Sequence, residues 1–226
     1  MNGSLWPRSA GTPRIHGSGP QGTPLRPVLE LARRLCLALC AAVPLLLAGC
    51  GGSDVRFAST DITGADYGKG FALTDHGGKP RRLEDFRGKV VTLFFGYTQC
   101  PDVCPTNLTA MAQVMKSLGD DARRVQVLFV TVDPERDTQD LLAQYVPAFH
   151  ADFLGLRGDA ETTRKTAQEF KVFYEKVPGK TATSYTVDHT AGTYIFDPKG
   201  RLRLYVRHGE APEVIAGDIK LLLAGK

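Results

Sequence analysis

The sequence predicts an α/β domain, with a central mixed β-sheet flanked by helices and with a β-hairpin and a helix at its C-terminal end. Two continuous apolar runs rich in β-branched residues, Lys89–Phe95 and Val125–Val132, are typical of strands buried on both faces. A helical pattern lies between them, and this order implies a right-handed parallel crossover. A strand–turn–strand pattern and a last helical pattern close the chain.

The elements that lead up to the crossover are short. Residues 71–74 favour a strand, and the glycines in residues 75–79 favour a tight turn after it. Residues 83–86 favour a single helical turn. The first buried strand follows directly, so the domain is expected to begin with small elements packed beside its main sheet.

The crossover helix is expected to begin at Pro105 and to end at Gly119, because proline suits the first turn and glycine the residue after the last. Met111 and Met115 lie on its apolar stripe. Although methionine can bind soft metals, this spacing assigns both residues to the core. The stripe consists of Leu108, Met111, Val114, Met115 and Leu118.

The remaining elements complete a recognisable order. Parallel strands come first, an antiparallel hairpin follows and a helix ends the chain, which is the thioredoxin-like order. We find no internal repeat, Gly-rich phosphate loop or hydrolase triad motif in the sequence. The expected elements are helices at 138–145 and 160–170, a short segment at 153–156, strands at 193–197 and 201–206 around a turn at 198–200, and a helix at 212–224.

Composition and charge exclude several classes of protein. The 226 residues are 42% hydrophobic and 23% charged, which argues against a disordered, collagen-like or polytopic membrane protein. The formal charge of +4 comes entirely from residues 1–49, which hold five arginines and one glutamate. Residues 50–226 are therefore formally neutral, and a nucleic-acid partner has no support.

The first fifty residues predict a lipoprotein signal peptide. An apolar stretch of 14 residues, Leu35–Ala48, follows Arg33 and Arg34, and its length suits a signal-peptide core rather than a membrane span. The small residues before Cys50 are those that bacterial lipoprotein processing reads, so we expect Cys50 to become a lipidated N-terminus. A buried core helix is the alternative, but it should be amphipathic, and this stretch is apolar all round.

Three further boundaries follow from composition. Residues 1–27 are rich in proline, glycine and serine, which is unusual at the start of a signal peptide, and we hypothesise that they are untranslated. Translation would then begin nearer Val28 or Leu29. Residues 50–66 are small and polar and predict a flexible tether. Residues 67–226 are expected to form the thioredoxin-like domain.

The cysteines predict redox or metal chemistry. Cys36 and Cys40 would leave with the signal peptide, and lipid would consume Cys50, so Cys100 and Cys104 would be the remaining thiols. Two thiols four residues apart cannot staple distant segments, as a structural disulfide framework would. A reversible dithiol or a metal site is the better interpretation.

Cys100 and Cys104 follow a central strand and precede a helix, at the sheet edge where open α/β sheets place their active sites. Helix N-terminal amides favour thiolate over thiol. At this spacing a helix would hold the Cβ atoms about 5 to 6 Å apart. Because a disulfide requires about 3.5 to 4.5 Å, oxidation should need a local rearrangement and should be reversible.

Two thiolates favour Cu(I), with Zn(II) as a competitor, and a third ligand would sharpen the choice. His189 precedes the strand at 193–197, and if that strand runs antiparallel to Lys89–Phe95, His189 faces the cysteines. Cys100, Cys104 and His189 would then form a trigonal Cu(I) site, with room for another ligand in Cu(II). A histidine before a strand is more often structural, but the topology favours the ligand role.

The other polar candidates are less specific. Asp102 and Asp188 are either supports of the metal ligands or turn residues, with neither interpretation favoured, and Asp133 is better explained as a turn or helix-start residue. His16 leaves with the leader. The remaining histidines have no partner in the sequence pattern and are assigned structural or surface roles. These are His76, His150 and His208.

Three motifs in this order resemble the Sco/SenC family over residues 57–226. They are Cys100-Pro-Asp-Val-Cys104-Pro105, Asp133-Pro-Glu-Arg-Asp137, and Asp188-His189-Thr190 followed by Tyr-Ile-Phe-Asp-Pro-Lys-Gly at 194–200. The resemblance implies a thioredoxin-like copper-binding protein that helps to assemble the dinuclear copper centre of cytochrome c oxidase and that acts on its thiols. By motif match it implies copper ligation by Cys100, Cys104 and His189. Many members of that family use a transmembrane helix where this chain is expected to use a lipid.

Two functions from different classes remain. The first is a metallochaperone that delivers copper to the oxidase. The alternative is a periplasmic thiol-disulfide oxidoreductase with copper incidental, and a peroxidase is a weaker third. General oxidoreductases of this fold resemble one another in a two-residue cysteine spacing and in a proline before the antiparallel strand. This chain has three residues between Cys100 and Cys104 and has His189-Thr190 in place of the proline, so copper delivery is favoured.

The expected partners follow from this function. They are the copper-bearing subunit of cytochrome c oxidase, a periplasmic thiol reductase that keeps the dithiol reduced, and another copper chaperone as donor. The expected location is the periplasmic face of a bacterial membrane, with the lipid on Cys50 as the anchor.

Overall fold

The computed structural model describes residues 56–181 and 184–226 of the chain. The expected leader at 1–49 and the expected lipidation site, Cys50, lie outside these ranges. Within them, eight strands form one mixed sheet in the order β1-β10-β9-β4-β5-β6-β2-β3. The strands are β1 (Thr60–Asp61), β2 (Ala72–Asp75), β3 (Pro80–Arg82), β4 (Val90–Gly96), β5 (Val125–Thr131), β6 (Leu154–Arg157), β9 (Thr193–Phe196) and β10 (Leu202–Val206).

The two predicted buried strands are confirmed and form the centre of the sheet. β4 and β5 pair in parallel from Val90 opposite Val125 to Gly96 opposite Thr131, and every residue of both strands is buried. β6 adds a third parallel strand. β9 pairs antiparallel with β4, and β10 pairs antiparallel with β9, as the predicted hairpin requires.

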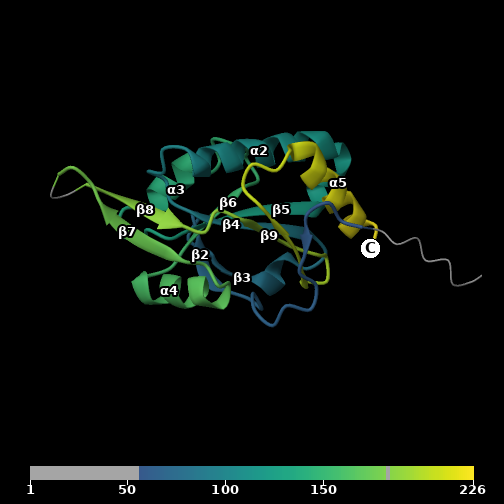
Figure 1. Ribbon diagram of the computed structural model, residues 1–226, viewed down its shortest axis with the longest axis horizontal. Coiled ribbons are helices and arrows are strands. Elements are labelled where there is room, and N and C mark those ends of the chain that lie inside the picture. Colours follow the sequence, from purple (N-terminus) through teal and green to yellow (C-terminus); the bar gives the residue numbers. More distant parts are fainter. Residues whose placement is uncertain (1–55, 182–183) are drawn as a thin grey trace, which may run out of the picture. The chain divides into compact units, whose positions relative to one another are not determined.

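Helices cover both faces of this sheet. Figure 1 shows α2, α3 and α5 over one face and α4 over the other. The methionines of the predicted stripe, Met111 and Met115, lie on the buried face of α2 and belong to the core. This arrangement confirms the predicted thioredoxin-like class. The helices are α2 (Val103–Leu118), α3 (Gln139–Tyr145), α4 (Ala160–Glu169) and α5 (Pro212–Leu223), with 3-10 turns at Leu83–Phe86 and Gly119–Arg124.

The described end of the expected tether is built into the domain. β1 pairs with β10, and the backbone amides of Ala58 and Ser59 donate hydrogen bonds of 2.9 and 2.8 Å to the carboxylate of Asp218 in α5. The ordered domain therefore starts before residue 67, where the composition placed its beginning. Within the described ranges, no helix is both long and apolar enough to cross a membrane.

One pair of strands was not predicted. β7 (Tyr174–Pro178) and β8 (Tyr185–His189) form a separate two-stranded antiparallel sheet, which projects from one end of the domain (Figure 1). The β7 segment is short and mostly exposed and ends in proline, so it lacks an apolar alternation that would mark a strand. His189 is consequently the last residue of a strand.

The β9–β10 turn is organised by Asp197. One of its carboxylate oxygens accepts hydrogen bonds from the amides of Lys199 and Arg201, at 2.9 and 3.0 Å, and the other accepts from the Arg201 side chain at 2.8 Å. Arg203 lies 3.4 Å from the same carboxylate. Burial opposes the charge, but the hydrogen bonds and the charge of Arg201 outweigh it, so the pKa of Asp197 is lowered.

This interaction predicts a pH dependence of stability. Because the folded-state pKa of Asp197 lies below its unfolded value, the carboxylate stabilises the fold fully above that unfolded value, about 3.9, and the contribution is lost as the pH falls through the folded pKa. Asp197→Asn should lower the free energy of unfolding by about 1 to 3 kcal/mol at pH 7. Urea unfolding between pH 3 and 7 measures this, and a difference from wild type that stayed constant below pH 4 would contradict it.

Candidate metal centre

The two cysteines lie where β4 ends and α2 begins. Cys104 is in the first turn of α2 and is completely buried, whereas Cys100 precedes the helix and is half-buried. The helix starts at Val103, two residues before the expected Pro105. Both thiols are free, and the backbone amide of Cys104 lies 3.4 Å from the Cys100 sulfur. Since Cys100 is outside the helix, the two cysteines do not share a helix face as the sequence pattern suggested.

Gly96 allows this close approach. A Cβ atom at position 96 would lie 2.8 Å from the Cys104 sulfur and 2.8 Å from the ring of Phe129. Gly192, just before β9, allows a different close approach, because a Cβ there would lie 2.0 Å from the ring of Tyr205 in β10. The sequence pattern singled out neither position. Gly96 therefore allows Cys104 to pack against the end of β4, and Gly192 allows the start of β9 to pack against β10.

His189 reaches the cysteines, as the sheet topology predicted. Phe94 in β4 lies opposite Thr193 in β9, so the start of β9 is at the same edge as the end of β4. The Nε2 atom of His189 is 3.6 Å from the Cys104 sulfur. One ligand atom from each of Cys100, Cys104 and His189 lies within 4.8 Å of the others. Within the described ranges, no other group of three such side chains converges in this way.

The imidazole is oriented for metal binding. Its Nδ1–H donates a 3.0 Å hydrogen bond to the Thr190 carbonyl oxygen, which leaves the lone pair of Nε2 directed toward the sulfur. The rings of Phe94 and Tyr97 make edge contacts with it, at centroid distances of 5.9 and 6.0 Å. Burial lowers the pKa of His189, which favours the neutral form that binds metal.

The electrostatic environment of Cys104 differs from the expectation based on the helix N-terminus. Burial raises the pKa of the Cys104 thiol well above its usual range, and this effect exceeds the stabilisation of a thiolate by backbone amides. The thiol is therefore protonated at neutral pH in the absence of a cation. A bound metal ion would supply the positive charge that a buried thiolate needs.

The three candidate aspartates lie in different environments. Asp102 is exposed at the start of α2, where it accepts a long 3.4 Å hydrogen bond from the Thr106 hydroxyl, and Asp188 is exposed on β8. Asp133, for which a turn role was favoured, is completely buried. It forms an ion pair with Arg136 and accepts a 2.9 Å hydrogen bond from the Tyr185 hydroxyl. Asp133 thus connects the end of β5 to the hairpin that carries His189.

Arg136 extends this connection to the loop between β4 and α2, residues 97–102, which contains Cys100 and is called the cysteine loop below. Its guanidinium donates hydrogen bonds to the Gln99 side chain at 3.2 Å and to the Tyr185 carbonyl oxygen at 2.9 Å. It also lies 3.5 Å from the centroid of the Tyr185 ring, in a cation–π contact. Arg136 belongs to the motif at 133–137, but the sequence assigned it no role. Its partners Gln99 and Tyr185 lie 37 and 49 residues away along the chain, so only the fold brings them together.

Asp137 links the cysteine loop to the end of β5. This buried carboxylate accepts hydrogen bonds from the amide and hydroxyl of Thr98, the latter at 2.6 Å, and from the Thr131 hydroxyl at 2.5 Å. Burial raises the pKa of Asp137, although these hydrogen bonds oppose that effect. The loop that leads to Cys100 is therefore held to the end of β5 by short polar contacts.

The remaining histidines lie away from the cysteines. His76 Nδ1 accepts from the Gly155 amide at 3.0 Å, and His150 Nδ1 accepts from the Asp152 amide at 3.2 Å. Both contacts suit the structural roles expected of them. His208 is exposed at the end of β10.

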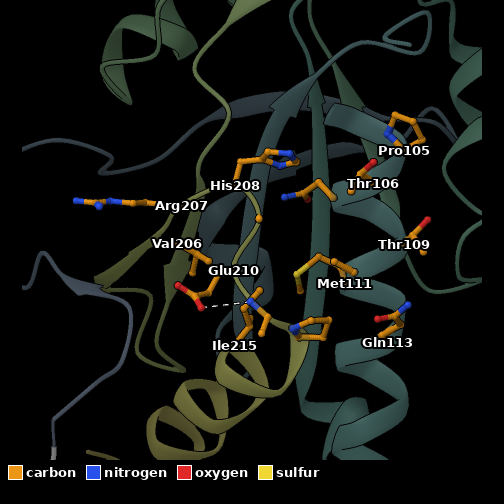
Figure 2. Close-up of a pocket in the computed structure, with 15 residues that line it drawn as sticks. Pro105, Thr106, Thr109, Met111, Gln113, Val206, Arg207, His208, Glu210 and Ile215 are labelled. Atoms are coloured by element: carbon orange, nitrogen blue, oxygen red, sulfur yellow. Dashed lines mark hydrogen bonds between the residues drawn. The ribbon is translucent and has the colours of Figure 1, made fainter. Parts of the chain in front are cut away.

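His208 also lines a cavity of about 480 Å³ between α2 and the segment leading into α5 (Figure 2). The side chain of Glu210 points away from His208 in this view and accepts a 3.2 Å hydrogen bond from the Ala211 amide. Met111 contributes a buried wall of the cavity. The polar groups do not converge on one point, and neither cysteine lines the cavity, so it is separate from the metal centre.

Comparisons with known proteins show which family the chain is similar to. A family model described as SCO1/SenC matches residues 59–224. The chain is 36% identical to the mitochondrial SCO2 homolog of Bos taurus, over 94% of this chain and 83% of the bovine protein. It is 39% identical to the SCO2 homolog of Mus musculus, over 71% of this chain and 64% of that protein.

Solved structures give the same result. ScoI of Bradyrhizobium japonicum with copper bound superposes with a TM-score of 0.65 and 40% identity, and the match covers 70% of this chain and all of that one. Apo Sco1 of Thermus thermophilus superposes with a TM-score of 0.67 and 43% identity, over 76% of this chain and all of that one.

The contacts of Arg136 predict an effect on metal affinity. Arg136→Lys keeps the charge beside Asp133, but a lysine lacks the planar fork that reaches Gln99 and Tyr185. The hairpin should then hold His189 less firmly, and the affinity for Cu(I) should fall about tenfold. Anaerobic competition with a chromophoric chelator measures this, with the exposed α4 variant Arg164→Lys as the matched control. Equal affinities in the two variants would show that Arg136 does not position the ligand.

Proposed function

The chain belongs to the SCO1/SenC family, and from this premise we propose that it binds copper through Cys100, Cys104 and His189 for the assembly of cytochrome c oxidase. The observation that carries the proposal is the convergence of two sulfurs and one imidazole nitrogen within 4.8 Å. Its relative from Bradyrhizobium japonicum has a solved structure with copper bound, which supports the choice of metal.

The donor chemistry suits copper in both oxidation states. Two thiolates and a neutral imidazole form a trigonal set for Cu(I), and a fourth ligand would complete a set for Cu(II). Zn(II) is a competitor for the same donors. A groove of about 600 Å³ opens beside Cys100 and His189, so a ligand of a partner protein could approach the ion from this side. Stepwise exchange of ligands would then pass copper to the recipient.

The partners and the location are part of the proposal. The recipient is the copper-bearing subunit of cytochrome c oxidase, whose thiols this protein would also reduce, and another copper chaperone acts as the donor. A periplasmic thiol reductase keeps Cys100 and Cys104 reduced, because copper capture requires free thiols in an oxidising compartment. The protein would be anchored by a lipid on Cys50 to the periplasmic face of a bacterial membrane.

Thiol-disulfide exchange is the second candidate function. Cys100 is half-buried and Cys104 is completely buried, an arrangement that suits an accessible attacking thiol and a protected resolving thiol. The Cys104 amide donates a 3.4 Å hydrogen bond to the Cys100 sulfur, and such a bond favours the thiolate that attacks in thiol-disulfide exchange. It differs from the first in leaving His189 without a direct chemical role.

Removal of His189 should separate ligand binding from simple dithiol chemistry. Wild-type protein should bind one Cu(I) per chain with two sulfur ligands and one nitrogen ligand. His189→Ala should lose the nitrogen ligand and at least about tenfold in affinity, whereas His150→Ala should match wild type. Anaerobic titration and X-ray absorption measure both properties. If His189→Ala bound copper with unchanged affinity and ligand count, the assignment of His189 would be wrong.

Added copper should distinguish delivery from thiol reduction. Deletion of the protein in its own organism should reduce the assembly of cytochrome c oxidase. If copper delivery is the principal function, millimolar copper in the medium should restore oxidase activity, while added thiol reductant alone should not. Oxidase activity and the copper content of purified oxidase provide the measurement. Restoration by the reductant alone would instead favour the oxidoreductase.

A further inference from the structure

The β7–β8 hairpin has one face packed on the domain and one face free. Residues opposite each other in an antiparallel pair share a face. On the inner face Lys176 lies opposite Val187, which is buried. On the outer face Glu175 lies opposite Asp188 and Val177 opposite Thr186, and all four are exposed.

Two large apolar side chains are exposed along this hairpin. Phe173, immediately before β7, is 61% exposed, and Val177, four residues later on the same face, is 38% exposed. They are the exposed large apolar side chains of the described part of the chain. Since a strand places residues i, i+2 and i+4 on one face, Phe173, Glu175 and Val177 form a continuous stripe. Of the two, Phe173 lines the same groove as Cys100 and His189, so the stripe begins at the candidate site and leads away from it along the hairpin.

The same stripe carries an unbalanced charge. Glu175 and Asp188 are directly opposite each other, and like charges in this position destabilise a strand pair. Neither forms a salt bridge with any residue at 56–181 or 184–226. The neighbouring Lys176 projects from the other face, where it pairs with Glu135 at 2.6 Å. A cation from another molecule would relieve this repulsion.

The outer face continues into the groove beside the metal centre. Phe173, Thr186 and Asp188 line that groove together with Cys100 and the exposed Asp102. No lysine or arginine of the described ranges lines it. A molecule that seats on Phe173 and Asp188 would therefore stand next to Cys100, on the side from which an exchanging ligand must approach.

We propose that the outer face of the β7–β8 hairpin, formed by Phe173, Glu175, Val177, Thr186 and Asp188, is the docking surface for the protein that receives the metal. The recipient is expected to present a lysine or arginine between apolar side chains, so that the cation meets Glu175 and Asp188 and the apolar groups cover Phe173 and Val177. This inference rests on the proposed function, because it assumes that the metal leaves through the adjacent groove.

The test uses the full-length protein and, as the probe, the soluble copper-binding domain of the oxidase subunit from the same organism. Phe173→Ser removes the apolar anchor, and Glu175→Lys reverses one charge. Because the introduced lysine would face Asp188, the second variant should not weaken the hairpin itself. The control is Glu84→Lys, which makes the same change in net charge on the exposed 3-10 turn that follows the edge strand β3.

Both hairpin variants should transfer Cu(I) to the probe about tenfold more slowly than wild type in anaerobic stopped-flow measurements at low salt. Added salt should slow the wild-type transfer, and Glu175→Lys should show a smaller dependence on salt. Glu84→Lys should behave as wild type. Copper stoichiometry and affinity should be unchanged in all three variants, since none of these side chains supplies a ligand.

The outcomes separate the two proposals. Wild-type transfer rates in both hairpin variants, with copper binding intact, would overturn the docking surface and leave the copper site standing. If wild-type protein bound no copper, the proposed function would fail. In that case the association of the two metal-free proteins, followed by NMR chemical shifts, still tests the surface. Shifts confined to the hairpin would support it, and shifts elsewhere or none would overturn it.

Discussion

The ion pair between Asp133 and Arg136 is the interaction on which the geometry of the metal centre depends. The hairpin that ends in His189 belongs to a separate two-stranded sheet, so the central sheet does not hold it in register. Arg136 joins three segments at once, namely the end of β5, the cysteine loop and the hairpin, through Asp133, Gln99 and Tyr185. A buried ion pair contributes little net stability, because desolvation offsets its attraction, but its geometry is specific.

Burial has a consistent effect on two of the candidate ligands, Cys104 and His189. It disfavours the charged form of each group, so Cys104 is held as a thiol and His189 as a neutral imidazole. A metal-free centre of this kind avoids an uncompensated buried charge. Binding of a cation reverses the balance for the thiol, and the proton leaves as the ion enters. The site is therefore compatible with a stable apo state as well as a loaded one.

The strongly patterned parts of the fold were predictable from sequence. β4 and β5 are continuous apolar runs, α2 has a regular stripe, and the edge shared by β4 and β9 was enough to bring His189 to the cysteines. The β7–β8 hairpin was not predictable. Its first strand, β7, is polar and ends in proline, and the hairpin is held by contacts with residues distant in the sequence, such as Asp133 and Arg136. The roles of Arg136 and Gly96 were also missed, since both depend on partners that only the folded chain brings near.

The spacing of the three candidate ligand residues has a thermodynamic consequence. Cys100 and Cys104 are neighbours along the chain, whereas His189 is 85 residues beyond Cys104. An unfolded polypeptide can offer the two thiols together but cannot offer the complete triad. A metal ion would therefore bind the native state preferentially and stabilise it. The free energy of unfolding would rise by about 2.7 kcal/mol at a free metal concentration about one hundred times the dissociation constant. Molecules without a bound metal ion would therefore unfold most readily and be the most exposed to proteolysis, so degradation would leave the metal-bound molecules in excess.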